Sequence, residues 1–595
     1  MSPRYRVPIM ASSRSRWTPP LYSLLLALVI LGPLLGPGYL LLRDAVSTPR
    51  SYFTDSAWGI ADAAARAVPQ DAALAALTTV FDGGLIVKTV LLLALWMAGW
   101  GAAVMAHKVL PTVPLPGLLV ASTVAVWNPY VAERLLQGHW SLLVGYAALP
   151  WTVVAAIGVR SGRSWWSLSV CLAAAGLTPT GALLAASIAL LVVALPGGAR
   201  RGLRVVVTLV IAAVASAPWL TATAVSGSGV EQADPAGWAA FAARAEPGLG
   251  TLGSLAGLGG IWNSDAVPAS RTGLFALMGT ALLLTVVVLG VRPLIRRRRN
   301  PVILVLGVVA LGAIVIPALA ATGPGLAVAR AVGDIVPGAG LLRDSQKWVA
   351  LAMPVYALAA AAAFSPRRPP NPVQPTALSA VQRTRFGGWL PAAVAILVLV
   401  IALPDLGWGV GTTLKPVAYP SSWEAVSAEL SGQSGDVAVL PAGMFRRFPY
   451  SGSAPVLDPA PRILPLDVLQ TGELIVAGGT VRGEGTRAPD VQSALLAGES
   501  AETLAELGVG WVLVENTTPG ELGNSAQTLS PLEVMYSDEQ LTLYRIPEPV
   551  IIESRSSTAV VVAHLAWALL LLGGLAIGLL SRFTVRQNVR RSDQP

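Results

Sequence analysis

Long apolar runs separated by short polar stretches fill the chain from residue 21 to residue 404, and one more run lies near its end. A helix needs roughly 20 apolar residues to cross a hydrocarbon core. The pattern therefore predicts an all-α polytopic membrane protein of about twelve transmembrane helices, two of them short for a crossing. The predicted spans are 21–42, 85–106, 114–128, 140–159, 165–178, 181–196, 204–222, 272–291, 301–320, 349–365, 388–404 and 558–580.

A long polar segment precedes the last span and has the pattern of a small α/β domain. The predicted helices are 423–430, 490–497 and 501–507, with Ser500 placed to cap the third. The predicted strands are 436–440 and 511–515, followed by a hairpin of 532–536 with 541–546. We therefore expect a transmembrane module over 1–404, an exported α/β domain over 405–557, and a final helix with a basic tail over 558–595.

The distribution of charged residues predicts the side of the membrane on which each loop lies. Only 12% of the 595 residues are charged, against about a quarter in soluble domains. Basic residues cluster in alternate loops, in the N-terminal segment and in the tail, which places those parts in the cytoplasm. The segment 405–557 holds 19 acidic and 8 basic residues, which fits the exported side. The net charge of +9 therefore reflects topology, and we expect the lipid bilayer and no nucleic acid as a partner. The segment 366–387, rich in Pro and Arg, is predicted to be a cytoplasmic linker.

The motifs of several enzyme and transporter classes are missing. The sequence holds no Walker motif, no HExxH and no CxxC pair, and its one cysteine, Cys171, allows no disulfide within the chain. The predicted spans carry almost no charge at mid-depth, whereas ion-coupled transporters usually need carboxylates or histidines there. The chemistry is therefore expected in the external loops.

Three external loops carry polar residues at the depth of a lipid headgroup. A carboxylate could act as general base on an acceptor hydroxyl, and cations could hold a phosphate. The candidate base is Asp44, with Asp55 as the second choice. The candidate substrate-binding residues are Glu133, Arg134, His139, Arg343, Asp344 and Lys347.

Structural roles compete with these assignments. Asp44 could form an interfacial ion pair with Arg43, and Asp55 could cap a helix that begins near Ser56. Glu133 and Arg134 could form a salt bridge, and His139 could hold a structural hydrogen bond. Two further cations, Arg343 and Lys347, would share a helix face, where we favour phosphate binding because both oppose the positive-inside trend.

Several motifs together resemble the GT-C superfamily of membrane glycosyltransferases, most closely the actinobacterial arabinofuranosyl- and mannosyltransferases of cell-envelope assembly. The motifs are the acidic residue after the first span (Asp44), the Asn128–Trp140 loop with its Gly138-His139 ending, Gly259–Asn263, Leu342-Arg343-Asp344, Leu507–Val514 and Leu543–Ile546. The first loop departs from the tightly paired acids of some members. The resemblance implies a polyprenyl-phosphate sugar donor and an acidic base in the first external loop.

The expected function is therefore transfer of a sugar from a polyprenyl-phosphate donor to a glycan or glycolipid acceptor at the outer face of the cytoplasmic membrane. A divalent cation, Mg²⁺ or Mn²⁺, is the one cofactor that the external carboxylates could hold with the donor phosphate. Two alternatives stay open: a flippase or transporter of a lipid-linked glycan, and a non-catalytic scaffold for envelope assembly.

Overall fold

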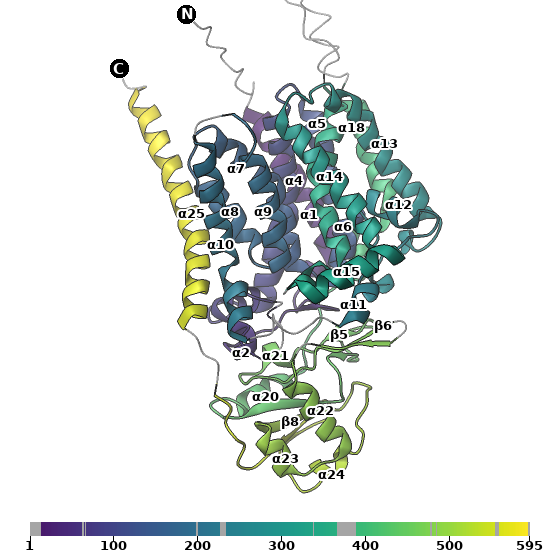
Figure 1. Ribbon diagram of the computed structural model, residues 1–595, viewed down its shortest axis with the longest axis vertical. Helices are drawn as coiled ribbons and strands as arrows, with labels where there is room; N and C mark the ends of the chain where they lie inside the picture. Colours follow the sequence, from purple (N-terminus) through teal and green to yellow (C-terminus); the bar gives the residue numbers. More distant parts are fainter. Residues whose placement is uncertain are drawn as a thin grey trace, which may run out of the picture.

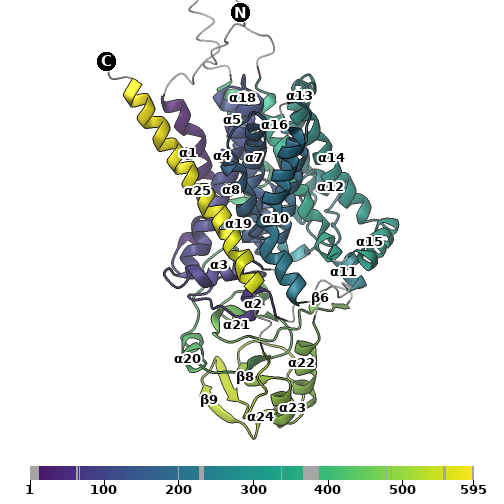
Figure 2. The ribbon, with the colours of Figure 1, turned by 60° about the vertical axis from the view of Figure 1, so that its left-hand side comes forward.

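The computed structural model describes residues 13–61, 65, 67–197, 200–226, 234–336, 338–365, 388–476, 479–483, 485–553 and 558–592. Figure 1 shows a bundle of helices in its upper part and a smaller α/β domain below it. The helix α1 begins, and the helix α25 ends, at the end of the bundle that faces away from the α/β domain (Figures 1 and 2). The predicted linker 366–387 lies outside the described residues.

The described residues contain eight helices that are long and apolar enough to cross a membrane. The number is nine if one pair of helices, bent at a short break, is counted as a single span. They support a polytopic membrane protein but not twelve spans. The eight are Arg16–Leu35 (α1 and η1), Gly83–Val109 (α4), Leu115–Gln137 (α5 and α6), Trp140–Arg160 (α7), Arg201–Ser226 (α10), Phe275–Ile295 (α13), Pro301–Ala320 (α14) and Thr558–Ser581 in α25.

The number of spans is lower than the predicted twelve for local reasons. The apolar runs at 165–178 and 181–196 form only α8 (Trp166–Ala175) and α9 (Pro179–Val193), which are too short for the full thickness. The run at 349–365 starts as the 3₁₀ helix η5 (Ser345–Ala352) and continues as α16 (Met353–Ala362). The run at 388–404 gives α18 (Trp389–Ala402), which bends by 77° into the following helical segment.

Predicted loop regions contain ordered helices. The stretch 128–139 is the buried helix α6 (Pro129–Gln137), which continues from α5 (Leu115–Val126) after a break at Asn128. The first span ends earlier than predicted, because α1 (Ser13–Leu31) and η1 (Gly32–Leu35) stop at a Gly-Pro-Gly sequence. The remaining helices of this part are α2 (Asp55–Trp58), α3 (Gln70–Leu77), α11 (Pro235–Ala240), η2 (Ser264–Ala266), η3 (Ala269–Arg271), α12 (Gly250–Ala256), α15 (Gly323–Ile335), η4 (Ala339–Leu342), η6 (Pro404–Leu406) and α19 (Gly407–Thr412).

The α/β region contains the elements that the sequence predicts, within a few residues. Its four-stranded sheet has the order β3-β8-β10-β9, with β3 and β8 parallel and the other pairs antiparallel. Ser500 caps its helix by accepting from the Thr503 N–H, as expected. The strands are β3 (Asp436–Leu440), β8 (Val509–Glu515), β9 (Glu533–Ser537) and β10 (Leu541–Arg545), with β4 (Phe445–Arg446) paired to β5 (Val456–Leu457) and β6 (Leu474–Val476) paired to β7 (Gly479–Val481). The helices are α20 (Ser422–Glu429), α21 (Ala460–Ile463), α22 (Arg487–Ala497), α23 (Ala501–Glu506) and α24 (Ser525–Leu529).

The first loop after α1 is hydrogen-bonded directly to this α/β region. It forms a short hairpin of β1 (Leu41–Leu42) and β2 (Ala45–Val46). Arg43, in the turn of that hairpin, bridges to Val456, and the Leu457 N–H donates to the Arg43 carbonyl at 2.7 Å. The loop that carries Asp44 is therefore held between the helical bundle and the α/β region.

Candidate functional site

Asp44 sits in the turn between β1 and β2, on a backbone that is fixed from two sides. Its N–H donates to the Gln137 carbonyl at 3.1 Å. The neighbouring Arg43 adopts φ 47°, an uncommon conformation for a residue with a side chain. The Arg43 guanidinium donates to the carbonyls of Leu136, at 2.7 Å, and Asp265. Arg43 therefore anchors the turn to the end of α6 and is not bonded to the Asp44 side chain.

The end of α6 can approach this hairpin because residue 138 is glycine. Gly138 ends α6 with φ +86°, a left-handed conformation that favours glycine. A Cβ at this position would lie 2.3 Å from the Ala45 nitrogen and 2.6 Å from the Leu42 carbonyl oxygen. The Gly-His sequence therefore brings His139 against the turn that carries Asp44.

The carboxylate of Asp44 is bound by two side chains from this helix end. The Asp44 Oδ2 atom lies 3.0 Å from Gln137 Nε2 and 3.0 Å from His139 Nε2. Nδ1 of His139 lies 2.9 Å from the Arg134 guanidinium. Because a guanidinium can only donate, Nδ1 must accept, so that the proton of a neutral imidazole sits on Nε2 and points at Asp44. About 33% of the Asp44 side chain is exposed, so the carboxylate is open to a substrate.

The same guanidinium continues the network to the residues before η5. Arg134 is fully buried and makes a two-bond pair with Asp344, at 2.8 and 3.1 Å. Lys347 Nζ lies 3.5 Å from Asp344 Oδ2, and 23% of the Lys347 side chain is exposed. Such forked pairs fix geometry as well as charge. Asp44, His139, Arg134, Asp344 and Lys347 thus form one chain of alternating partners.

Burial and neighbouring charges together set the protonation states of these linked side chains. Burial raises the pKa of Asp44, but the His139 and Gln137 hydrogen bonds and the Lys347 charge outweigh it, so the pKa lies below its ordinary value. Burial lowers the pKa of His139 despite the Asp44 hydrogen bond. The pKa of Asp344 is lowered because the charges of Arg134 and Lys347 exceed the effect of burial. At neutral pH, Asp44 is therefore ionised beside a neutral His139.

Glu133 directly precedes Arg134 in α6 and joins the network through a glutamine. Its two carboxylate oxygens accept from the Gly260 and Ile261 N–H groups, both at 3.1 Å. Gln346 donates to Glu133 at 3.1 Å and accepts from Arg134. The Gly-Gly-Ile segment is thus fastened to α6, and Glu133 and Arg134 are joined through Gln346. Glu133 is wholly buried, so its position supports the site from behind.

Two predicted site residues lie apart from this network. The N–H groups of Asp55 and Ser56, in α2, donate to the Asp467 carboxylate at 3.0 and 2.9 Å. The cap of α2 is Thr54, which accepts from the Ala57 N–H, because α2 begins one residue earlier than expected. Asp55 therefore faces the junction with the α/β region.

The second is Arg343. Its guanidinium carbon lies 5.5 Å from the centroid of the Phe241 ring, and its Nε donates to the Gly340 carbonyl at 3.2 Å. Lys347 belongs to the 3₁₀ helix η5, whereas Arg343 precedes it, so the shared α-helical face that the sequence suggested does not form. The two cations have different surroundings.

Sequence reasoning did not select two residues of the network, Gln137 and Gln346. Gln137 donates to Asp44 and accepts from the Asn263 amide at 2.8 Å. Gln346 directly precedes Lys347, and Gln137 lies two residues before His139, so their sequence position was a signal. Their roles depend on contacts across more than 90 residues of chain, which spacing alone does not reveal.

The carboxylates of the site are already paired with cationic or neutral donors. Among the residues that the structure describes, no group of three or more His, Cys, Asp or Glu side chains is placed to hold a metal ion. Asp44 is the accessible carboxylate of the network, so any divalent cation here would need ligands from a substrate phosphate. The expected cation stays a prediction.

Comparison with known proteins gives a fold. No family model matches the sequence, and no curated protein matches it either. Among solved structures, the arabinofuranosyltransferase AftD from mycobacteria is similar, with a TM-score of 0.53 at 17% identity over 92% of this chain. A mutant of the same enzyme gives 0.51 at 15% identity over 90%. The chain therefore shares the fold of this arabinofuranosyltransferase, in line with the resemblance that the sequence motifs suggested.

The likeness covers only part of those larger proteins. This chain spans 41% and 42% of the two AftD chains. At such identity the comparison shows the fold alone.

Proposed function

We propose that this protein is a membrane glycosyltransferase that moves a sugar from a polyprenyl-phosphate donor to a cell-envelope glycan or glycolipid at the outer face of the cytoplasmic membrane. The observation that carries the proposal is the network from Asp44 to Lys347. It joins an accessible, ionised carboxylate to a partly exposed ammonium group. A general base and a phosphate-binding cation are the two groups that such a transfer needs.

Asp44 is suited to the role of base. Both of its hydrogen bonds from His139 and Gln137 reach Oδ2, and in the described part of the chain no side chain or backbone group donates to Oδ1. An acceptor hydroxyl could therefore donate to Oδ1. As the new bond forms between the hydroxyl oxygen and the anomeric carbon of the donor, the proton passes to Asp44. The bond from the anomeric carbon to the phosphate oxygen breaks, and its electron pair leaves with the phosphate.

Lys347 is suited to hold the leaving phosphate. Its ammonium group is shared with the Asp344 carboxylate, and its charge acts on Asp44 as well. A cation at this position stabilises negative charge that grows on the phosphate as the bond breaks. The guanidinium of Arg134 is committed to Asp344 and His139, so it orients these groups. Arg343, beside Phe241, stays a second candidate for the phosphate.

The decisive experiment compares the two carboxylates of the first loop. Purified protein in proteoliposomes would receive a radiolabelled polyprenyl-phosphate sugar and a glycan acceptor. We expect Asp44→Asn to lower transfer by about 10² to 10⁴-fold, the range for losing a general base. Asp55→Asn, a matched change whose residue lies at the α2 junction, should retain most of the activity. Equal activity of Asp44→Asn and the unmodified chain would overturn the proposal.

The same vesicles separate the alternatives. A flippase would move the labelled lipid between leaflets without forming a new glycosidic bond, and Asp44→Asn would leave that movement unchanged. A scaffold would do neither and would bind glycan alone. Transfer that depends on Asp44 is expected only of the glycosyltransferase.

A further inference from the structure

The helix α15 has an apolar side that the described part of the chain leaves uncovered. All 13 of its residues are described, and none of them is buried. Val328, Val332 and Ile335 are exposed by 64%, 36% and 78%. Residues three or four positions apart are neighbours on a helix surface, so these three side chains form one stripe, the α15 apolar face. An apolar patch of this kind on a protein surface indicates a contact with a partner.

The other sides of α15 are packed or polar. A Cβ at Gly333 would lie 2.7 Å from the Trp238 ring, so this side of the helix packs against α11. With 3.6 residues per turn, Gly333 and the α15 apolar face lie on different sides of the helix. The exposed Arg330 and Asp334 lie four residues apart on a third side, and their charges are opposite. The helix is therefore amphipathic, and its apolar face points away from the protein.

The preceding span places α15 at the boundary of the hydrocarbon core. The 20 residues of α14, at about 1.5 Å per residue, cover about 30 Å, which is the thickness of that core. Thr322 caps α15 by accepting from the Gly325 N–H at 3.2 Å, so that α15 begins three residues after α14 ends. Figure 1 shows α15 across the end of the bundle that is nearest to the α/β domain. The exposed side chains of α14 are Leu304, Val308, Leu311, Ile316 and Leu319 among others.

Two other exposed apolar features lie at this end of the bundle. Val80 and Phe81 are exposed in the turn after α3, directly before Asp82 caps α4. Figure 2 shows α3 and α15 on opposite sides of the bundle. The exposed Trp408 lies against Gly32, where α1 gives way to η1, and tryptophan is enriched where a membrane meets water. Exposed apolar groups thus occur around the bundle at the level of α15.

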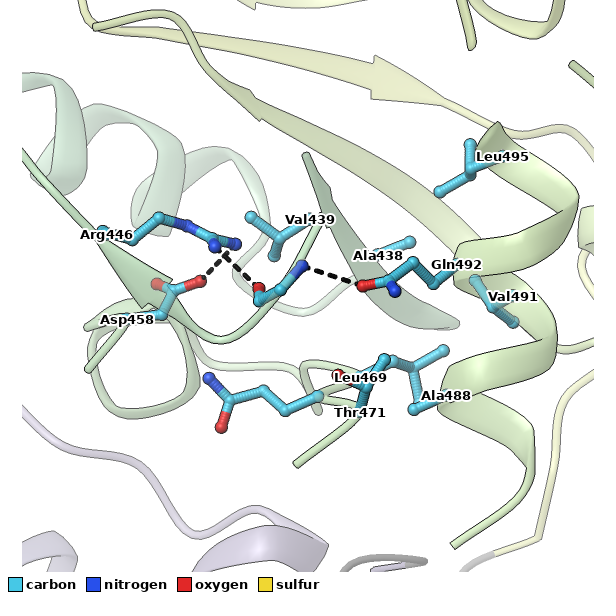
Figure 3. Close-up of a pocket in the computed structure, with 12 residues that line it drawn as sticks. Ala438, Val439, Arg446, Asp458, Leu469, Thr471, Ala488, Val491, Gln492 and Leu495 are labelled. Atoms are coloured by element: carbon cyan, nitrogen blue, oxygen red, sulfur yellow. Dashed lines mark hydrogen bonds and ion pairs between the residues drawn. The ribbon is translucent and has the colours of Figure 1, made fainter. Parts of the chain in front are cut away.

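The α/β region is fixed in place and does not cover the α15 apolar face. Its β5 strand bridges to Arg43, and a buried pair holds the β4–β5 hairpin from within, with Arg446 and Asp458 3.0 Å apart (Figure 3). The Arg482 N–H, directly after β7, donates to the Asp234 carboxylate at 2.9 Å, which joins the region to the start of α11. Covering the face would require these contacts to break.

We propose that α15 is an interfacial helix whose apolar face is inserted among the acyl chains of the leaflet on the α/β side. Arg330 and Asp334 then lie among the lipid headgroups. Lipid is the occupant that the structure favours, because the α15 apolar face follows directly on the exposed apolar surface of the α14 span. A helix with one apolar and one charged side typically lies in the plane of the membrane surface in this way.

The insertion of α15 would also set the depth of the candidate phosphate site, a consequence that rests on the proposed function. Arg343 comes eight residues after Ile335, and Lys347 follows in η5. An α15 helix anchored at the acyl-chain boundary would hold both cations at the level of the headgroups. The phosphate of a polyprenyl-phosphate donor lies at that level.

The test measures lipid contact of single residues in the full chain. Cysteines are introduced as Val332→Cys and Ile335→Cys in a Cys171→Ser background, labelled with a fluorophore and placed in phosphatidylcholine nanodiscs. The quenchers are a phosphatidylcholine with a nitroxide near the top of its acyl chain, and iodide in water. We expect the lipid to reduce the fluorescence at both positions, as it does for Leu311→Cys on the α14 span, and iodide to have little effect.

Matched controls separate membrane contact from simple exposure. Asp334→Cys lies on the polar side of the same helix, and Gln433→Cys lies at an exposed site of the α/β region. Iodide should quench both labels, and the nitroxide lipid should leave the Gln433→Cys label unchanged. Because all of these positions are exposed except that of the replaced cysteine, the labels should not disturb the fold.

Each outcome decides the proposal. Quenching by iodide and not by lipid at Val332→Cys and Ile335→Cys would overturn it. Protection from both quenchers would also overturn it, and would indicate that a second copy or another protein covers the face. Lipid quenching at both positions, together with transfer that survives Asp44→Asn, would refute the proposed function and leave the interfacial helix standing. Transfer that depends on Asp44 without lipid quenching would have the opposite meaning.

Discussion

The Nε2 atom of His139 lies 3.0 Å from the Asp44 Oδ2 atom, and the opposite ring nitrogen of this histidine faces a guanidinium. These two contacts fix which ring nitrogen of His139 carries the proton. Arg134 can only donate, so His139 presents its N–H to Asp44 and holds one carboxylate oxygen. The other oxygen is left for a substrate. A protonated imidazole would place two cations against each other, which the burial of His139 already disfavours.

Acid should therefore destabilise the protein through His139. Because its pKa in the folded chain is lowered, the unfolded chain takes up this proton first, and stability falls as the pH drops below about 6.5. We expect His139→Gln to remove that part of the pH dependence. Unfolding midpoints in detergent, measured between about pH 5 and about pH 7.5, would report it.

Asp44 affects the stability of the folded protein over a separate, lower range of pH. Its lowered pKa gives stability that is present above the ordinary carboxyl pKa of about 3.9 and lost as the pH falls through the folded value. Asp44→Asn is a second test, which should keep or steepen the pH dependence between about 5 and 7.5, because the Asp44 hydrogen bond raises the pKa of His139. An unchanged slope in His139→Gln would contradict the assigned charge state.

Replacing Asp344 should destabilise the fold. Asp344→Asn leaves the fully buried Arg134 without its counterion, and breaking such a pair costs about 3 to 5 kcal/mol. The unfolding midpoint should fall by several degrees. Asp334→Asn, at an exposed position of α15, is the matched control and should leave the midpoint unchanged. Similar midpoints for the two variants would mean that the Arg134 pair is dispensable.

Gly138→Ala tests the close approach of α6 to the Asp44 turn. The alanine meets both a left-handed backbone and the Ala45 nitrogen at 2.3 Å. We expect a loss of about 2 to 4 kcal/mol, made up of about 1 kcal/mol for the left-handed backbone and about 1 to 3 kcal/mol for the steric contact. Gly162→Ala isolates the backbone part, because Gly162 has φ +75° and nothing within 4 Å of its Cβ position. Equal losses, measured by thermal unfolding, would show that the contact has no cost.

Lys347→Ala should weaken donor binding and slow transfer. Removing this cation takes away a charge-assisted contact worth about 1.5 to 3 kcal/mol, or about 10 to 150-fold in affinity. Lys415→Ala, at an exposed position, controls for general charge loss. Arg343→Ala decides whether the second predicted cation also takes part. A donor affinity that follows Arg343 and ignores Lys347 would move the phosphate site to the Phe241 side.

Hydropathy located nearly every apolar helix, but it did not give the number of crossings. The runs at 165–178 and 349–365 are apolar enough for a membrane, yet they form short or partly 3₁₀ helices that pack against other helices. Composition cannot distinguish a residue that faces lipid from one that faces protein, because both environments are apolar. The strands of the α/β region were easier to predict, since β3 and β8 are continuous apolar runs between turns.

Sequence reasoning was also only partly successful for the candidate site. Residue type and position near a span end selected Asp44, His139, Arg134, Asp344 and Lys347, which the structure brings together. The same reasoning selected Asp55, whose backbone N–H is bonded to Asp467 at a place apart from this network. The difference depends on where the α/β region docks, and that is set by contacts between residues about 400 positions apart.

The bridge between Arg43 and Val456 has a consequence for how this protein can be divided. In the sequence, the α/β region is an insertion between two helices and looks like a part that could be cut out or exchanged. In space, its β5 strand completes the turn that carries Asp44. A chimera that receives a different α/β domain would therefore lose the partner of that turn, and a deletion would expose it. Related proteins can vary this region only if the edge that meets residue 43 is kept.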